Sequence, residues 1–208
     1  MRVLLLSPHT DDVELGAGGL VCRLLEEGGH TFKWLVFSRC EDSLGPGMPA
    51  DTLEREFQSC ADFLGIADRQ VLDFTVRTMP ARRQEILESL VRARREFSPD
   101  LVVAPSEDDV HQDHQTVAAE ALRAFKSSAT ILGYELPWNN VAFRSTLLVR
   151  LTEAQVQRKW RALEHYRSQV SLGRDYFSQE FVTSWARLHG AQCGAEYAEA
   201  FDVPRAVL

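Results

Sequence analysis

Short apolar runs alternate with longer segments of helical periodicity along most of the chain. An apolar run between polar or turn-forming residues is typical of a buried strand, whereas apolar residues at three- and four-residue spacing are typical of an amphipathic helix. Their alternation indicates repeated strand–helix–strand units and a mainly parallel sheet. The pattern therefore predicts an α/β protein, with strands over residues 3–7, 32–38, 71–74, 101–105, 130–134 and 144–151.

Helices are expected to cover both faces of this sheet, which gives a three-layer α/β/α, Rossmann-like fold. In the first helix, Leu15, Leu20, Leu24 and Leu25 recur at helical spacing, and the glycine at position 28 ends the helix. Residues 39–49 contain a Gly-Pro-Gly sequence and are expected to form a loop that borders the ligand site. The predicted helices span residues 14–27, 51–64, 81–97, 113–125, 154–166 and 176–197.

Composition limits the class of protein. The 208 residues fit one α/β domain, so we expect a single domain over residues 1–208. The formal net charge of -7 argues against a general nucleic-acid or anionic-membrane binder. No apolar stretch approaches the roughly 20 residues of a membrane span, and the apolar run at residues 1–6 is too short for a signal peptide, so we expect a cytoplasmic protein. The four cysteines include no C-x-x-C pair and are expected to be reduced thiols.

Two clusters of metal-ligating side chains each follow a predicted strand. Residues 8–14 (PHTDDVE) come directly after the first strand, and residues 111–114 (HQDH) follow the strand at 101–105. The carboxyl ends of strands in an open α/β sheet face the ligand crevice. If the first and fourth strands are neighbours, as in the strand order 3-2-1-4-5, the two clusters meet at the topological switch point. The sequence therefore predicts one site built from both.

The residue types in this site match a zinc centre. A catalytic zinc ion typically takes about three His and carboxylate ligands and leaves one position for water. His9, Asp12 and His114 supply that set, which predicts one zinc ion per chain. Asp11 is then free to act as the general base on water, and His111 to donate a proton to the leaving group or to hydrogen-bond an oxyanion. Ligand type alone discriminates weakly among divalent metals, so another ion can occupy the same site.

Two further carboxylates are expected to support the ligands. Asp113 can orient an imidazole by a hydrogen bond, and Glu14 lies in the first helical turn, where the helix dipole favours a carboxylate. The dipole is also an alternative explanation for Asp11 and Asp12, and a surface loop histidine is the alternative for His111. The second cluster favours the metal site over these alternatives.

The two clusters resemble those of a known enzyme family. Pro-His-x-Asp-Asp-x-Glu near the amino terminus, followed about a hundred residues later by His-x-x-Asp-His, looks like the PIG-L/LmbE-like zinc-dependent N-deacetylases. The resemblance implies that His9, Asp12 and His114 bind zinc, that Asp11 is the base, and that His111 acts as the acid or the oxyanion partner. Residues 55–65 and 165–169 (HYRSQ) resemble further family segments. Thr10 and Gln112 depart from it, because the family often has proline at both positions.

The substrate that this resemblance implies is a small N-acetylated amino sugar or sugar conjugate. A sugar site needs hydrogen bonds to hydroxyl groups and often an aromatic face. By its resemblance to the family helix, Arg55 is one candidate contact. Loop and strand-end positions offer four more, namely Glu41, Asp42, Glu135 and Trp138. Exposure to solvent is an equally good explanation for Arg55, Glu41 and Asp42, and packing beneath a loop for Trp138.

We therefore expect a metal-dependent amide hydrolase in which water, activated by the metal and Asp11, attacks the N-acetyl carbonyl. No serine or cysteine lies beside a base in a recognisable motif, which disfavours an acyl-enzyme route. A metal-dependent phosphoesterase is the alternative enzyme class, and it would often hold two ions. A sugar- or nucleotide-binding module without catalysis is the non-enzymatic alternative. The identity of the sugar, its carrier group, the acyl group and the oligomeric state, including a homo-oligomer, stay open.

Overall fold

A seven-stranded sheet runs through the molecule in the strand order β3-β2-β1-β4-β5-β7-β6. The computed structural model describes residues 1–207. The first five strands of the chain are parallel, and β7 runs antiparallel to both of its neighbours. The strands are β1 (Arg2–Ser7), β2 (Thr31–Val36), β3 (Arg69–Val71), β4 (Leu101–Pro105), β5 (Thr130–Tyr134), β6 (Leu147–Leu151) and β7 (Tyr197–Arg205).

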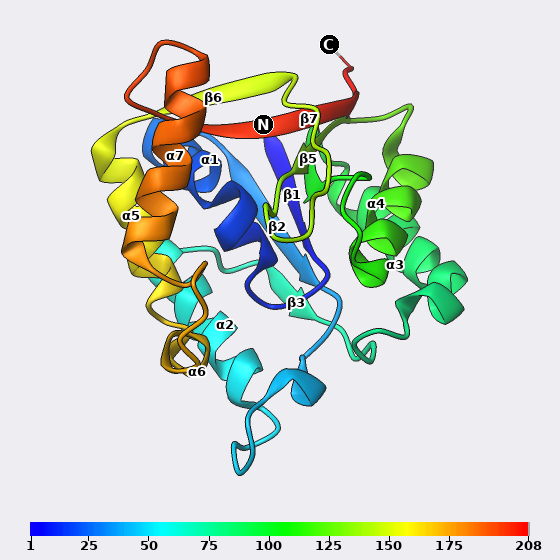
Figure 1. Ribbon diagram of the computed structural model, residues 1–208. Coiled ribbons are helices and arrows are strands. Elements are labelled where there is room, and N and C mark those ends of the chain that lie inside the picture. Colours follow the sequence, from blue (N-terminus) through cyan, green and yellow to red (C-terminus); the bar gives the residue numbers. More distant parts are fainter. Residues whose placement is uncertain (208) are drawn as a thin grey trace.

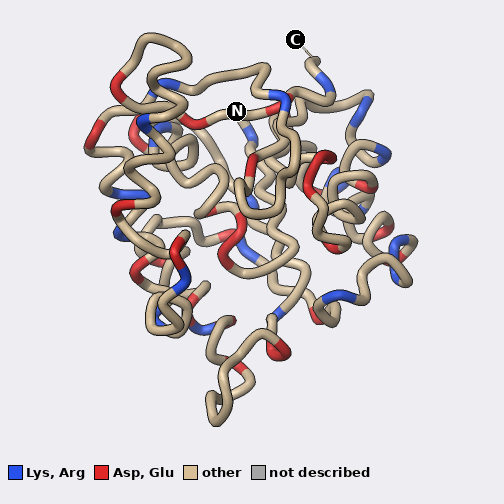
Figure 2. The backbone as a smooth tube through the Cα atoms, in the orientation of Figure 1, with Lys and Arg blue, Asp and Glu red and all other residues tan. Residues whose placement is uncertain are grey.

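Helices cover both faces of the sheet, which confirms the predicted α/β/α layers. In Figure 1, α1, α2, α5 and α7 lie on one side of the strands, and α3 and α4 lie on the other. Acidic and basic residues are interspersed along these outer helices (Figure 2). The helices are α1 (Asp12–Glu27), α2 (Thr52–Leu64), α3 (Arg83–Phe97), α4 (Gln112–Phe125), α5 (Glu153–Leu163), α6 (Arg167–Ser171) and α7 (Gln179–Gln192), with short 3-10 turns η1 (Glu41–Ser43) and η2 (Met79–Arg82).

Strand β1 shows why its sequence reads as a continuous apolar run. Val3 and Leu5 pack into the core beneath α1, whereas Leu4 and Leu6 pack into the core beneath α3 and α4. All four side chains are fully buried. Successive side chains of a strand point to opposite faces, so a strand covered on both faces must be apolar at every position. This buried strand is a rigid support for the polar residues that follow it.

The position of the candidate site follows from the pairing of β1 with β4. The two strands are parallel neighbours, with Leu5 opposite Val103. The loops that leave their carboxyl ends lead into α1 and α4, so the two clusters of ligating residues lie side by side. The predicted order 3-2-1-4-5 is confirmed for the first five strands. This edge of the sheet is the topological switch point, where open α/β proteins bind ligands.

The carboxyl-terminal third differs from the prediction. The helix expected over residues 176–197 is shorter, and β7, which was not predicted, follows it. The strand was not predicted because it contains a buried carboxylate, which interrupts the apolar pattern expected of a buried strand. Glu199 lies near the start of β7 and is 5% exposed, and its two oxygens accept hydrogen bonds from the backbone N–H groups of Gly19 and Leu20 at 2.7 and 2.6 Å. A polar residue in a buried strand is stable when its hydrogen bonds are satisfied in this way.

The same carboxylate joins three elements. Lys159 of α5 lies 2.8 Å from Glu199 through its Nζ atom and also donates to the Leu15 carbonyl of α1 at 2.6 Å. Gly19 allows this arrangement, because a Cβ at that position would lie 2.9 Å from the Glu199 carboxyl. Loss of either charged partner would leave the other buried and unpaired, which is strongly destabilising. The ion pair therefore fixes α1 and α5 against the antiparallel edge of the sheet.

Other boundaries also differ from the prediction. Strand β3 covers residues 69–71 rather than 71–74, and β6 begins at Leu147 rather than at residue 144. The helix expected over 154–166 ends at Leu163 and is followed by α6. The predicted loop at 39–49 contains the short turn η1. These edges are set by tertiary contacts, which local propensity does not record. No helix within residues 1–207 is long and apolar enough to cross a lipid bilayer.

Candidate metal centre and active site

The loops after β1 and β4 place His9, Asp11, Asp12, His111 and His114 around one cavity of about 240 Å³. His9 and Asp11 belong to the turn that ends β1, and Asp12 is the first residue of α1. His111 precedes α4, and His114 lies in its first turn. Two loops that are about a hundred residues apart in the sequence thus form one site.

Three side-chain atoms that could bind a metal ion converge at the bottom of this cavity. His9 Nδ1 lies 3.0 Å from His114 Nε2, and Asp12 Oδ2 lies 3.3 Å from each of these nitrogen atoms. A tetrahedral zinc ion with bonds of about 2.0–2.1 Å places neighbouring ligand atoms roughly 3.3 Å apart. The three atoms therefore have the spacing of one face of a zinc tetrahedron.

Hydrogen bonds on the far side of each imidazole leave a lone pair facing the centre. His114 Nδ1 lies 2.6 Å from Asp109 Oδ2, and His9 Nε2 lies 3.2 Å from Asp113 Oδ2. A carboxylate accepts a proton and does not donate one, so both of these nitrogens carry the hydrogen. The opposite nitrogens, His114 Nε2 and His9 Nδ1, face the centre and bind a cation when it displaces their protons. Metal-binding histidines are commonly oriented by carboxylates in this way.

Asp109 is a supporting residue that the sequence analysis did not identify. It is fully buried in the loop before α4, where its second oxygen also accepts from the backbone N–H of His111 at 2.7 Å. Asp113, which was expected to orient an imidazole, lies against His9 on the other loop and accepts from the N–H of Arg77 at 2.6 Å. The only sequence signal for Asp109 is a carboxylate close before the histidine pair.

The charges at the centre favour a bound cation. Burial alone would lower the pKa of His9, but Asp12 and Asp113 raise it to about 9. For His114, burial is likewise outweighed by Asp12 and Asp109, and its pKa rises to about 10. Burial opposes ionisation of Asp12, yet the two imidazoles hold its pKa well below the usual range. The surrounding carboxylates thus stabilise positive charge at the point where the three ligand atoms meet.

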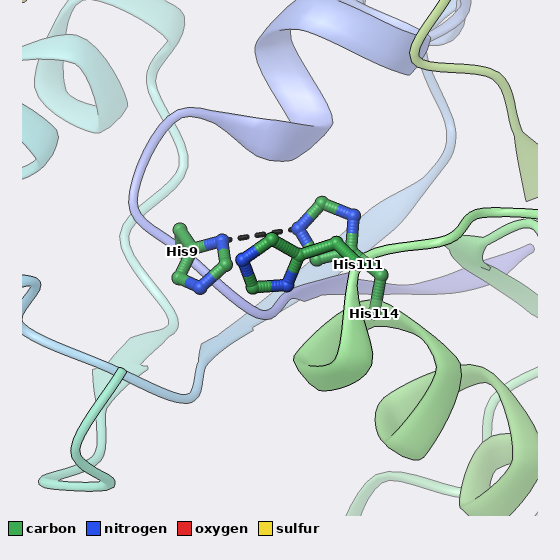
Figure 3. Close-up of side chains that lie close together, drawn as sticks. All are labelled: His9, His111 and His114. Atoms are coloured by element: carbon green, nitrogen blue, oxygen red, sulfur yellow. Dashed lines mark hydrogen bonds between the residues drawn. The ribbon is translucent and has the colours of Figure 1, made fainter. Parts of the chain in front are cut away.

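His111 lies beside this centre but faces it differently (Figure 3). Its ring centroid is 4.9 Å from that of His9 and 4.7 Å from that of His114. His111 Nδ1 accepts from the backbone N–H of Asp113 at 3.2 Å and caps α4. Burial and the other two imidazoles lower the pKa of His111, so the ring is neutral and its hydrogen is on Nε2. Nε2 is therefore a hydrogen-bond donor available to a bound molecule.

Within residues 1–207, the side chain of Asp11, unlike that of Asp12, has no hydrogen bond or ion pair to another residue. Burial and the adjacent Asp12 raise the pKa of Asp11 to about 6, while His9 and Arg174 act in the opposite direction. Its carboxylate lines the cavity. A carboxylate with a raised pKa and no competing partner is well suited to accept a proton from water.

Glu14 does not reach the ligand atoms. Its Oε1 is paired with the Tyr166 hydroxyl, which also contacts the carbonyl of Thr10, and its Oε2 is buried without a partner. Burial raises the pKa of Glu14 to about 8, so the carboxyl is neutral at pH 7. A protonated Glu14 can donate to the tyrosine oxygen while the tyrosine donates to Thr10. This chain of hydrogen bonds supports the loop that carries His9 and Asp11.

The structure places the five expected substrate contacts in different locations. Trp138 lines the cavity and stacks on Tyr176 with ring centroids 3.9 Å apart. The other four do not line it. Arg55 pairs with Asp51 on the surface of α2 at 3.2 Å, and Glu135 accepts from Trp185 and His189 beside α7. Glu41 and Asp42 line a neighbouring hollow on the other side of Cys40.

Several lining residues were not predicted. They come from α6 and the segment after it, which reach the cavity only in the folded chain: Gln169, Arg174 and Tyr176. Asn139 also lines the cavity, in the segment after β5 that was expected to border the site. Gln169 ends the HYRSQ segment, so the family resemblance was a signal for it. For Arg174 and Tyr176, polar and aromatic composition in a loop was the only sequence signal, and it does not distinguish a site from a surface.

Comparison with known proteins identifies relatives of this chain. Residues 4–125 match a family model described as PIG-L: GlcNAc-PI de-N-acetylase. The chain is 23% identical over 175 residues to the uncharacterized deacetylase YaiS of Escherichia coli K12, covering 80% of this chain and 90% of that protein. It resembles in fold the N,N'-diacetylchitobiose deacetylase of Pyrococcus horikoshii, at a TM-score of 0.81 and 21% identity over 97% of this chain and 83% of that one.

The same fold also carries a different chemistry. The 4-carboxy-2-hydroxymuconate hydratase GalB of Pseudomonas putida KT2440 matches at a TM-score of 0.82 and 20% identity, covering 100% of this chain and 97% of that one. Fold similarity alone therefore does not determine the reaction, which depends on the residues of the site.

Proposed function

Because this chain belongs to the PIG-L family and is an N-deacetylase, we propose that it hydrolyses the acetamide of an N-acetylated amino sugar or sugar conjugate with one bound Zn²⁺. His9 Nδ1, Asp12 Oδ2 and His114 Nε2 hold the ion. The observation that carries this proposal is the separation of these three atoms, 3.0–3.3 Å, with both imidazole hydrogens engaged by carboxylates on the far side.

The residues around the ligands have distinct tasks. Zinc bound in such a site lowers the pKa of a coordinated water and polarises a carbonyl group. Asp11 accepts the proton of the attacking water and can return it to the departing amine, because its carboxylate has no other partner. His111 donates from Nε2 to the carbonyl oxygen as negative charge develops there. The products are acetate and the free amine.

A covalent intermediate is not part of this proposal. Cys40 is the one cysteine among residues 1–207 that lines the cavity. Burial raises the pKa of its thiol far above the usual range, and Asp11 and Asp12 add to that effect. The reactive form of cysteine is the thiolate, so Cys40 is inert at neutral pH. The proposal is therefore direct attack by water.

The test is acetate release from a panel of N-acetylated amino sugars, free and conjugated, by protein of measured metal content. Asp11→Asn is the decisive variant, since it removes the base and keeps the three ligand residues. We expect it to retain zinc and to lose about two orders of magnitude or more in turnover. Asp68→Asn, at an exposed position that pairs with Lys33, is the matched control and should keep full activity.

Three results would contradict the proposal. Equal turnover in Asp11→Asn and the wild type would remove Asp11 as the base. Two metal ions per chain with release of inorganic phosphate from sugar phosphates would indicate a phosphoesterase. Tight metal and sugar binding without any turnover would indicate a binding module.

A further inference from the structure

We infer that the substrate carries an anionic group, a carboxylate or a phosphate, and that Arg174 at the rim of the cavity binds it. This inference rests on the proposed function, because it concerns the ligand of the same cavity. Arg174 lies in the segment between α6 and α7 and lines the cavity together with Tyr176 and Trp138. Nothing in the sequence pattern indicated a role for it.

The guanidinium of Arg174 has unused hydrogen-bonding capacity. Within residues 1–207 its side chain donates to one group, the Tyr176 hydroxyl, and no carboxylate lies within ion-pair distance. Some other arginines of the described chain pair with carboxylates, for example Arg83 with Glu120 and Arg69 with Asp62. A guanidinium has five N–H donors in a planar fork, which matches the two oxygens of a carboxylate or phosphate. The remaining donors of Arg174 are available to a ligand.

The charged residues that line the cavity indicate that Arg174 binds an anionic group. Arg174 is the only arginine or lysine among the described residues that line the cavity, whereas Asp11 and Asp12 contribute two carboxylates. The whole chain also has a formal net charge of -7. The proposed Zn²⁺ offsets these two carboxylates at the bottom of the cavity, so Arg174 is the cation that remains at the rim to attract an anionic group of the substrate. A neutral acetylated sugar needs no such group at the rim.

The rim has the layout of a two-part binding surface. Trp138 and Tyr176 are stacked at an interplanar angle of 14°, and Trp138 also lies against Phe181 and Trp185 of α7. The Arg174 guanidinium carbon lies 5.8 Å from the Tyr176 ring centroid. Aromatic faces can pack against the apolar face of a sugar, and the tethered guanidinium can then meet an oxyanion that projects from it. Arg174 is thus a specificity-determining residue of the rim.

The experiment measures binding of amino sugars, which are products of the proposed reaction and require no turnover. Calorimetry of the zinc-loaded protein would compare glucosamine with glucosamine 1-phosphate, glucosamine 6-phosphate and muramic acid. The first two anions test a phosphate at two positions, and muramic acid tests a carboxylate. The variants are Arg174→Met and, as the matched control, Arg95→Met at an exposed position on α3.

We expect at least one anionic ligand to bind about tenfold or more tightly than glucosamine, as for a charge-assisted contact worth roughly one decade of affinity. Arg174→Met should reduce that ratio to near one, and Arg95→Met should leave it unchanged. The preference should also weaken as salt is raised, because the arginine is exposed. The ratio of kcat/KM for the matching acetylated anionic and neutral sugars should fall in parallel.

The inference is wrong if wild-type protein binds all four ligands alike, or if the preference survives in Arg174→Met. It is also wrong if Arg174→Met lowers kcat/KM for neutral and anionic sugars equally, which would show that the arginine acts only on the charge of Asp11. An anion preference without any acetate release would support Arg174 and contradict the deacetylase. Acetate release without an anion preference would support the deacetylase and contradict the role of Arg174.

Discussion

The bottom of the cavity and its rim are built in opposite ways. At the bottom, His9, Asp12 and His114 each have hydrogen-bond partners that fix their orientation. Asp12 and His114 are also buried. At the rim, Arg174 has a single partner and lies in an exposed segment between two helices. The fold thus holds the proposed metal-binding residues rigidly, whereas the residues proposed to select the substrate lie on loops, which can vary without disturbing the sheet.

The largest effect should come from removal of a ligand at the bottom. His114→Ala replaces the imidazole of a proposed zinc ligand by a methyl group and leaves Asp109 without its partner. We expect loss of bound zinc and a fall in kcat of about a thousandfold or more. Metal analysis after dialysis, together with acetate release, measures both. Unchanged metal affinity would place His114 outside the coordination sphere.

A smaller effect is expected for His111, which lies beside the ligands without completing the triad of close atoms. The three histidines together also form a cluster whose nearest ligand atoms are within 4.8 Å of one another, so His111 is the natural competitor of Asp12 as a ligand. His111→Ala should keep the zinc and lower kcat by about a hundredfold. Asp12→Ala should lose the zinc. The opposite pair of results would exchange the two assignments.

Glu14 connects the loop that carries His9 and Asp11 to Tyr166, so its substitution should change the stability of the protein rather than its turnover. Its pKa is raised from 4.5 to about 8, so its protonated form is favoured by folding. The stability that this preference provides is complete below about pH 4.5 and is lost as the pH rises through 8. Glu14→Gln imitates the neutral form and removes this loss. We expect the variant to exceed the wild type by less than about 1 kcal/mol at pH 5 and by roughly 4 kcal/mol at pH 8.5.

Denaturant unfolding at the two pH values, at constant zinc concentration, measures this difference. Glu96→Gln, at an exposed position on α3, is the control and should give no pH-dependent change. A difference that is independent of pH would mean that Glu14 is ionised in the folded protein.

The smallest effect is expected at the rim, for Trp138→Ala. Trp138 is 36% exposed and contacts Tyr176 rather than the ligand residues. Loss of the aromatic ring of Trp138 should raise KM by about fivefold and leave kcat nearly constant. The expected contact between this ring and the sugar is the same in the ground state and in the transition state. Steady-state kinetics measure both constants. A large fall in kcat would show that the rim also positions the reacting amide, and the contrast between the two regions would then be weaker.

For the first half of the chain, the sequence alone predicted both the strand order and the residues of the candidate site. The apolar run of β1 followed by residues 8–14, and that of β4 followed by residues 111–114, predicted both the strand order at the switch point and the residues that meet there. These signals are local, since a doubly buried strand must be apolar throughout and ligand residues must follow its carboxyl end. The residues that follow β1 and β4 lie close together because the two strands are adjacent and parallel.

Tertiary structure alone decided the rest. Glu199 is charged in sequence and buried in β7, because Lys159 and two N–H groups of α1 meet it only after folding. Asp109 became the partner of His114, and Arg174 reached the cavity, through loops whose paths depend on α6, α7 and the antiparallel edge. Residue type and periodicity report which surfaces are buried in regular elements. They do not report which polar groups of separate loops satisfy one another, since that is fixed by long-range packing.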